Sequence, residues 1–265
     1  DAALTSAGGE DAFVVKIDAD GALLWAKSFG GVGEDRAQSI AVFKDESGFV
    51  LAGDFEDILR LEEETISAAA ELPSMFVGRF DALGTAVWLK TIVAENGPVE
   101  ASDIQVDSFS DIYVSGRFKG TATFAQDKTL TAEGTGFDAF VAKYNYSKGL
   151  HRWRLRTGGN ADEAFLDMFT VVDGGMEDGT TYLAGYMTRS YDSGTSFWQS
   201  NDSCSSVNTL WPSEVGKDAL IMKVSRMGCI TWVDSPKPLE EEGRGDEIAY
   251  GISTIQLTNQ ERRVV

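Results

Sequence analysis

Histidine and cysteine are scarce in this chain of 265 residues, and their scarcity excludes several kinds of site. His151 is the only histidine, which removes most catalytic arrangements that use an imidazole as general base. Cys204 and Cys229 are the only cysteines, so the sequence encodes neither a disulfide-rich framework nor a cysteine–histidine zinc cluster. The two cysteines either form one bridge in an oxidising compartment or remain as two buried thiols.

Basic residues are also few. The 23 Lys and Arg residues are outnumbered by 42 Asp and Glu residues, which gives a formal net charge of −19 and a pI of about 4.4. Such a surface repels phosphate groups, so we expect neither a nucleic-acid partner nor docking on an anionic membrane. The apolar runs are only a few residues long, too short to insert across a bilayer. Hydrophobic residues still make up 43% of the chain, which is enough for a real core.

A unit that contains a tryptophan occurs four times along the chain. Each copy joins an apolar segment, a turn rich in Gly and Asp, and a second segment that carries the tryptophan. The copies begin at Asp11, Met75, Asp138 and Asp218, and their tryptophans are Trp25, Trp88, Trp153 and Trp232. These tryptophans follow one another at intervals of 63, 65 and 79 residues, and the last interval is longer because of one insertion. We interpret them as the structural core of the repeat, packed between neighbouring units.

A second repeated block lies between these units. It consists of two β-branched or aromatic segments joined by a turn, and it recurs at 39–55, 103–118 and 165–186. Apolar and polar residues alternate with period 2 in 12–17, and no segment shows a clear amphipathic helical period. We therefore predict an all-β fold in which four-stranded sheets, each with an added hairpin, stack radially as the blades of a β-propeller.

Three segments resemble the SBBP-type β-propeller repeat, a seven-bladed-propeller-like repeat. They are Asp138–Tyr144, Leu24–Gly31 and Gly116–Phe124, and the resemblance extends over almost the whole chain. It implies a propeller fold and a place in a large secreted or surface protein, and it implies no agreed catalytic residues. The sequence departs from the repeat at Ser74, where an Asp is expected, at Glu62–Glu64, and in a long insert.

The repeats divide the chain into outer strands at 11–30, a blade at 38–92, a blade at 102–158, a blade at 164–233 with an insert at 188–217, and inner strands at 247–265. Residues 3–8 match 129–134, so we expect the chain to begin inside a linking hairpin. The two terminal half-blades either pair with each other or adjoin further repeats of a longer array. We expect the second arrangement, because the last residues fall inside a strand.

Two groups of carboxylates are candidates for chemistry. Acidic turns at 18–21 and 173–179 resemble calcium-binding loops, but neither is a complete EF-hand, and Asp and Gly are also the usual hairpin residues. Three carboxylate pairs precede the presumed innermost strands: Asp162 and Glu163, Asp246 and Glu247, and Glu34 and Asp35. Such pairs could serve as acid and base in glycoside hydrolysis. Their recurrence at equivalent repeat positions favours a structural role. We expect no cofactor, with calcium as the alternative.

The insert is the one segment that interrupts the repeats. It contains the aromatic residues Phe197, Trp198 and Trp211, which would contact a sugar or a partner, or else pack into a cap closed by a bridge between Cys204 and Cys229. Asn145 and Asn201 each begin an N-glycosylation sequon.

These features indicate a non-enzymatic extracellular or cell-surface module. We expect it to bind other protein chains or further repeats, as a domain of a filament, appendage or adhesin. A lectin-like propeller that binds carbohydrate or protein is the alternative, and a polysaccharide hydrolase is a third interpretation.

Overall fold

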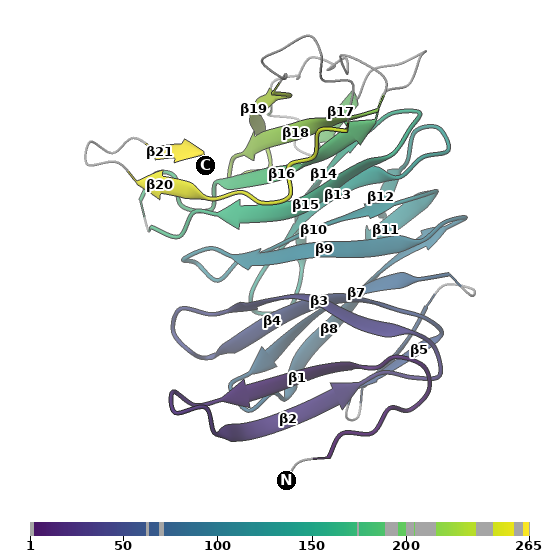
Figure 1. Ribbon diagram of the computed structural model, residues 1–265, viewed down its shortest axis with the longest axis vertical. Coiled ribbons are helices and arrows are strands. Elements are labelled where there is room, and N and C mark those ends of the chain that lie inside the picture. The colour runs from purple at the N-terminus through teal and green to yellow at the C-terminus, as the bar shows by residue number, and fades with distance from the viewer. Residues whose placement is uncertain are drawn as a thin grey trace.

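The computed structural model describes residues 3–61, 64–68, 72–173, 175–188, 196–199, 204, 216–236, 246–256 and 262–264, and in these residues the fold is all-β with no helix. None of these residues therefore forms a helix that could cross a membrane. The strands form antiparallel sheets that succeed one another from the N-terminal end to the C-terminal end of the molecule (Figure 1). This arrangement confirms the predicted propeller-like repeat fold.

Three sheets share one four-stranded order, from the innermost strand to the outermost. The first blade comprises β3 (Asp35–Val42), β4 (Gly48–Phe55), β7 (Ser74–Asp81) and β8 (Ala86–Glu95). The second comprises β9 (Val99–Val106), β10 (Ile112–Phe118), β13 (Asp138–Tyr144) and β14 (His151–Gly158). The third comprises β15 (Glu163–Thr170), β16 (Thr181–Thr188), β18 (Lys217–Val224) and β19 (Ile230–Asp234).

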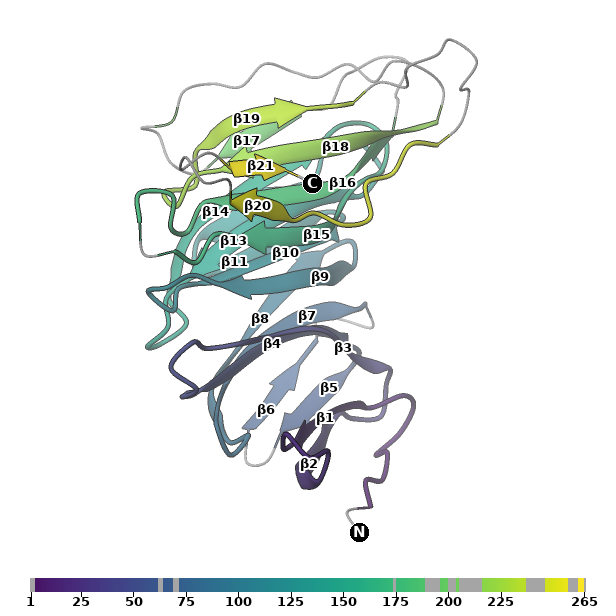
Figure 2. The same cartoon turned by 60° about the vertical axis from the view of Figure 1, so that its left-hand side comes forward.

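Two further strand pairs lie at the ends of this series. Before the first blade, β1 (Ala12–Ile17) pairs with β2 (Leu23–Phe29), which correspond to the two outer strands of a blade. After the third blade, β20 (Thr254–Gln256) pairs with β21 (Arg262–Val264). The N- and C-terminal ends lie at opposite ends of the molecule (Figures 1 and 2), so these two pairs do not join into one sheet.

Each linking hairpin attaches to the blade that precedes its own. The hairpin of β11 (Thr121–Ala125) and β12 (Lys128–Thr131) continues the sheet beyond β8, and β17 (Ser196–Gln199) continues it beyond β14. The hairpin of β5 (Ile58–Leu61) and β6 (Glu64–Ser67) reaches the end of β2 through a bridge between Gly30 and Arg60. A strand of one repeat thus extends the sheet of the preceding blade, and this pairing joins consecutive blades in addition to their packing.

The expectation that the chain begins inside a linking hairpin is wrong for residues 3–8. They form no strand, although their sequence matches a hairpin strand. Elsewhere such a hairpin attaches to the outermost strand of the preceding blade, and no such strand precedes β1 among the described residues. The segment instead runs beside the turn after β2, where the Gly9 N–H donates to the carbonyl of Val32 and the Ala7 N–H donates to Asp11.

The cores lie between successive blades, and strands buried on both faces supply them. Along β4, Phe49 and Leu51 pack toward β1, whereas Val50 and Ala52 pack toward the second blade. Such strands read as continuous apolar runs, in contrast to the alternation in β1. The core between the second and third blades is built in the same way, with Leu183 and Met222 among its members.

A β-bulge in each innermost strand lies beside a glycine of the neighbouring second strand. The bulges fall between Ala37 and Ser39, between Ala101 and Asp103, and between Phe165 and Asp167. A Cβ atom on Gly53, Gly116 or Gly185 would clash with the backbone oxygen of the adjacent innermost strand. The repeated glycine of the second strand therefore allows the two backbones to approach closely.

Candidate functional site

The repeated tryptophans bind across the junctions between blades. The Nε1–H groups of Trp88 and Trp153 donate to the carbonyl oxygens of Tyr146 and Arg226 at 2.9 Å. Trp25 makes the equivalent contact with Ala82 at 3.4 Å. In each case the indole extends from an outermost strand to the turn after the third strand of the next blade, so it joins two consecutive repeats.

The turns that receive these indoles carry glycines that fit the rings. Gly149 and Gly228 have positive φ angles of 62° and 84°. A Cβ atom would lie 2.9 Å from the Trp88 ring at Gly149 and 2.6 Å from the Trp153 ring at Gly228. Both the left-handed backbone and the space for the ring therefore require glycine. The fourth repeat tryptophan, Trp232, is 42% exposed, and among the described residues no turn of a following blade receives its indole.

In the acidic turns, aspartate side chains accept hydrogen bonds from backbone N–H groups of the same turn. Oδ1 of Asp18 accepts the N–H groups of Asp20 and Ala22, and Asp173 accepts the N–H of Gly175. Among the residues that the structure describes, no three carboxylate, histidine or cysteine groups gather as a potential metal site. The geometry of these turns therefore gives the calcium interpretation no support.

Asn145, one of the two sequon asparagines, also acts as a turn residue. It is only 9% exposed, and its Oδ1 accepts the N–H of Leu150 at 2.8 Å. Attachment of a glycan to the folded protein is disfavoured at this buried position. The other sequon residue, Asn201, lies outside the described residues.

Asp162 and Asp246, which were considered for hydrolysis, accept backbone N–H groups at the start of third strands. Asp162 accepts the N–H of Phe137 at 2.9 Å, and Asp246 accepts the N–H of Lys217 at 3.0 Å. These two contacts are equivalent in consecutive repeats, since each acceptor precedes an innermost strand and each donor adjoins a third strand. Both carboxylates thus join one repeat to the next.

Asp35 is a buried carboxyl group that makes stability depend on pH. Its Oδ2 accepts the N–H of Gly31 at 2.6 Å, while its Oδ1 and the Oδ1 of Asp11 are buried without a hydrogen-bond partner. Burial raises the pKa of Asp35 from 3.8 to about 6; the hydrogen bond from Gly31 opposes this rise and the negative charge of Asp11 adds to it. The folded state therefore binds a proton at Asp35 more tightly than the unfolded state does.

We expect the stability contribution of Asp35 to be fully present below about pH 4 and to be lost as the pH rises through about 6. The Asp35→Asn variant removes this titration. Urea denaturation between about pH 4 and 7 should therefore give a shallower fall in unfolding free energy for the variant than for the wild type. Two parallel pH profiles would contradict the assignment to Asp35.

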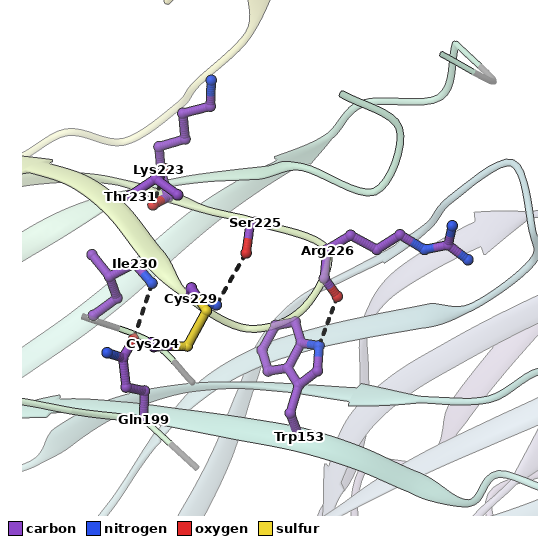
Figure 3. The surroundings of a disulfide bond; sticks show 9 residues. All are labelled: Trp153, Gln199, Cys204, Lys223, Ser225, Arg226, Cys229, Ile230 and Thr231. Carbon is purple, nitrogen blue, oxygen red and sulfur yellow. Dashed lines mark hydrogen bonds between the residues drawn. A yellow bond between two sulfur atoms is a disulfide. The ribbon is translucent and has the colours of Figure 1, made fainter. Parts of the chain in front are cut away.

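The insert is tied to the third blade by the predicted disulfide, which the structure contains. Cys204 and Cys229 are bonded, and the Ile230 N–H donates to Gln199 of β17 beside the bridge (Figure 3). Phe197 packs against the core between the second and third blades. The backbone of Trp198 pairs with Arg156, whereas the Trp198 side chain and Trp211 lie outside the described residues.

Sequence reasoning missed a groove at the N-terminal end of the molecule. In the described chain β1 pairs with β2 alone, so its other edge carries no strand. A groove of about 380 Å³ runs between β1 and β3, and we call it the β1–β3 groove; its apolar lining is Val14, Val15, Trp25, Ile40, Val42 and Phe49. Beside it, Phe13 is 61% exposed. The alternating apolar residues of 12–17 could have indicated this groove, but the sequence alone does not show that one edge of β1 is unpaired among the described strands.

Comparison with known proteins adds one distant match. No protein-family model matches the sequence. The chain is 25% identical over 160 residues, 54% of its length, to an uncharacterized WD repeat-containing protein of Acanthamoeba polyphaga mimivirus. The match covers 11% of that relative. WD repeats are of the β-propeller type, so the match agrees with the fold, whereas membership of the SBBP-type family stays a prediction.

Proposed function

We propose that this protein is a non-catalytic extracellular module that binds other proteins, as a domain of a cell-surface filament, appendage or adhesin. The observation that carries the proposal is the exposed apolar surface beside the β1–β3 groove. Phe13, Val15 and Ile17 on β1 and Ile40 and Val42 on β3 are all largely exposed. Contiguous apolar surface of this kind is typical of protein-binding sites.

The disulfide supports the extracellular part of the proposal. The bridge between Cys204 and Cys229 is a feature of oxidising compartments, because cytosolic thiols are kept reduced. The net charge of −19 favours solubility and disfavours nucleic acids as partners. The distant similarity to a WD repeat-containing protein is in line with a propeller as a binding scaffold.

The alternatives receive less support from the geometry. A lectin-like site in the insert would use Phe197, but this partly buried side chain packs against the core between the second and third blades. The other candidates, the side chain of Trp198 and Trp211, lie outside the described residues. A hydrolase would use Asp162 and Asp246, but both accept backbone hydrogen bonds that hold neighbouring repeats together.

The binding surface can be tested with two matched variants. Phe13→Asp places a charge on the exposed surface of β1, whereas Leu83→Asp places one in a turn after β7 where Leu83 is 71% exposed. We expect Phe13→Asp to abolish co-purification of partner proteins from the extracellular fraction of the native source, and Leu83→Asp to retain it. Equal retention of partners by both variants would contradict a binding role for this surface.

The compartment is tested separately, by fractionating the native source and alkylating free thiols before mass spectrometry. We expect the protein in the extracellular or surface fraction with Cys204 and Cys229 protected from alkylation. Recovery in the cytosol with both cysteines alkylated would contradict the extracellular proposal.

A further inference from the structure

The turn between the third and fourth strands has the same hydrogen-bonded frame in all four repeats. Its first residue donates its backbone N–H to the carbonyl of the last residue, and its own carbonyl accepts the N–H of the turn glycine. The four turns that share this frame are 18–22, 81–85, 145–150 and 225–229. Because the backbone frame is common, a difference between these turns lies in the side chains that support it.

In the first three of these turns an Asp or Asn side chain closes the turn. The Oδ1 of Asp81 accepts the N–H groups of Leu83 and Thr85, both at 2.9 Å. Asp18 and Asn145 each accept two backbone N–H groups of their own turns in the same way. One of the two donors is always the last residue of the turn, so the side chain holds the first and last residues together.

The fourth turn has a serine at this position and a disulfide four residues later. The Oγ of Ser225 accepts the N–H of Cys229 at 3.1 Å, and a serine hydroxyl closes such turns more weakly than Asp or Asn does. Cys229 is bonded to Cys204 (Figure 3). The last residue of the turn, which an Asp or Asn side chain holds in the other repeats, is therefore held here by a covalent bond.

The same bridge crosses the junction between the second and third blades. Cys204 follows β17 in the sequence, and β17 extends the sheet of the second blade through its pairing with β14. Cys229 belongs to a turn of the third blade, in which the carbonyl of Arg226 accepts the indole N–H of Trp153 at 2.9 Å (Figure 3). The disulfide and the Trp153 hydrogen bond therefore join the same two blades.

We propose that the bridge between Cys204 and Cys229 is a redox switch for this junction. A dithiol reductant can reach the bridge, because both cysteines are partly exposed. The reductant supplies two electrons and two protons, which convert the S–S bond into two thiols, while the reductant forms its own disulfide. The turn then keeps only its backbone frame and the weaker Ser225 contact, so the carbonyl that receives the Trp153 indole is held less firmly. This inference concerns one blade junction and does not depend on the proposed function.

Hydrogen exchange of the indole N–H groups in the purified 265-residue protein, labelled with ¹⁵N-tryptophan, tests the switch. We expect dithiothreitol to speed exchange at Trp153 at least about tenfold and reoxidation to reverse the change. Exchange at Trp88 should stay unchanged, because both cysteines of the chain lie away from the turn that receives its indole. Cys204→Ser should give fast exchange at Trp153 without any reductant.

Four results would overturn the proposal. They are unchanged exchange at Trp153 when both thiols are free by alkylation and mass spectrometry, an equal acceleration at Trp88, a change that reoxidation does not reverse, and a bridge that resists dithiothreitol in the folded protein. Because every readout is made on the purified protein, such a failure leaves the proposed binding function untouched.

Changes at Ser225 test whether the bridge compensates for the weaker side-chain acceptor. Ser225→Asn supplies the acceptor that Asn145 provides, without adding charge, and Ser225→Asp supplies that of Asp81. We expect both variants to cut the effect of reduction at Trp153 to about threefold or less, and Ser225→Ala, the matched control, to keep the full effect. Thermal unfolding of the oxidised variants checks that they fold. A wild-type response to reduction in both acceptor variants would overturn the explanation.

Discussion

Replacing Trp153 by alanine is expected to lower the free energy of unfolding by about 3–5 kcal/mol, the usual range for truncation of a buried aromatic side chain. The side chain is 6% exposed and lies in the core between the second and third blades. Its indole N–H donates to the carbonyl of Arg226 at 2.9 Å, so the substitution also leaves that carbonyl without this donor. Urea or thermal denaturation measures the effect.

Trp232→Ala is the matched control. Trp232 occupies the same repeat position, but it is 42% exposed and lies at the last complete blade. We expect a loss of about 1 kcal/mol or less, as for a surface substitution. Equal losses at the two positions would mean that the tryptophans act within their own blades and do not join consecutive blades.

The second large effect is expected at a buried group of charges in the second blade. The Nζ of Lys143 lies 3.2 Å from Asp107 and 3.0 Å from Asp111, and it donates to the hydroxyl of Tyr113 at 2.7 Å. The Tyr113 hydroxyl in turn donates to Asp107 at 3.0 Å. Burial raises the pKa of Tyr113, and the charge of Asp107 adds to this, so the phenol stays neutral and remains a donor.

Lys143→Met is therefore expected to destabilise the protein by about 3–5 kcal/mol, because it leaves the fully buried Asp107 without its closest cation. The matched control is Lys16→Met at the equivalent position of β1. There the lysine is exposed, and among the described residues its Nζ donates only to the carbonyl of Ala82, so we expect a loss of about 1 kcal/mol or less.

A double variant separates lost charge pairing from lost packing. Adding Asp107→Asn to Lys143→Met removes the carboxylate that has lost its closest cation and keeps only Arg226 at 3.7 Å, so part of the stability should return. If the double variant is as unstable as the sum of the two single variants, the lysine contributes through packing and the electrostatic explanation is wrong.

The blades could be predicted from the sequence because every repeat must satisfy the same packing requirements. The second-strand glycine and the inter-blade tryptophan recur at matching positions, since every junction needs the same close approach and the same indole contact. Residues 57–71 have helical propensity, but they align in sequence with 120–133, and β5 and β6 form a hairpin there as β11 and β12 do. Here the tertiary position of the segment overrides its local propensity.

Other features could not be predicted from the sequence. The pairing of β11 with β8 is a contact between repeats, and its partner cannot be read from either segment alone. The sequon at Asn145 has the same pattern as an exposed sequon, and only the fold shows that the side chain closes a turn. The β1–β3 groove could not be predicted either, because the residues of β1 match those of buried strands.

Hydrogen exchange of the indole N–H groups tests most directly whether tryptophans join consecutive blades. The protein would be labelled with ¹⁵N-tryptophan, and its side-chain signals would be assigned with single Trp→Phe variants. The account predicts slow exchange at Trp88 and Trp153, whose N–H groups donate across a junction, and fast exchange at the exposed Trp232. Exchange at Trp88 and Trp153 as fast as at Trp232 would contradict it.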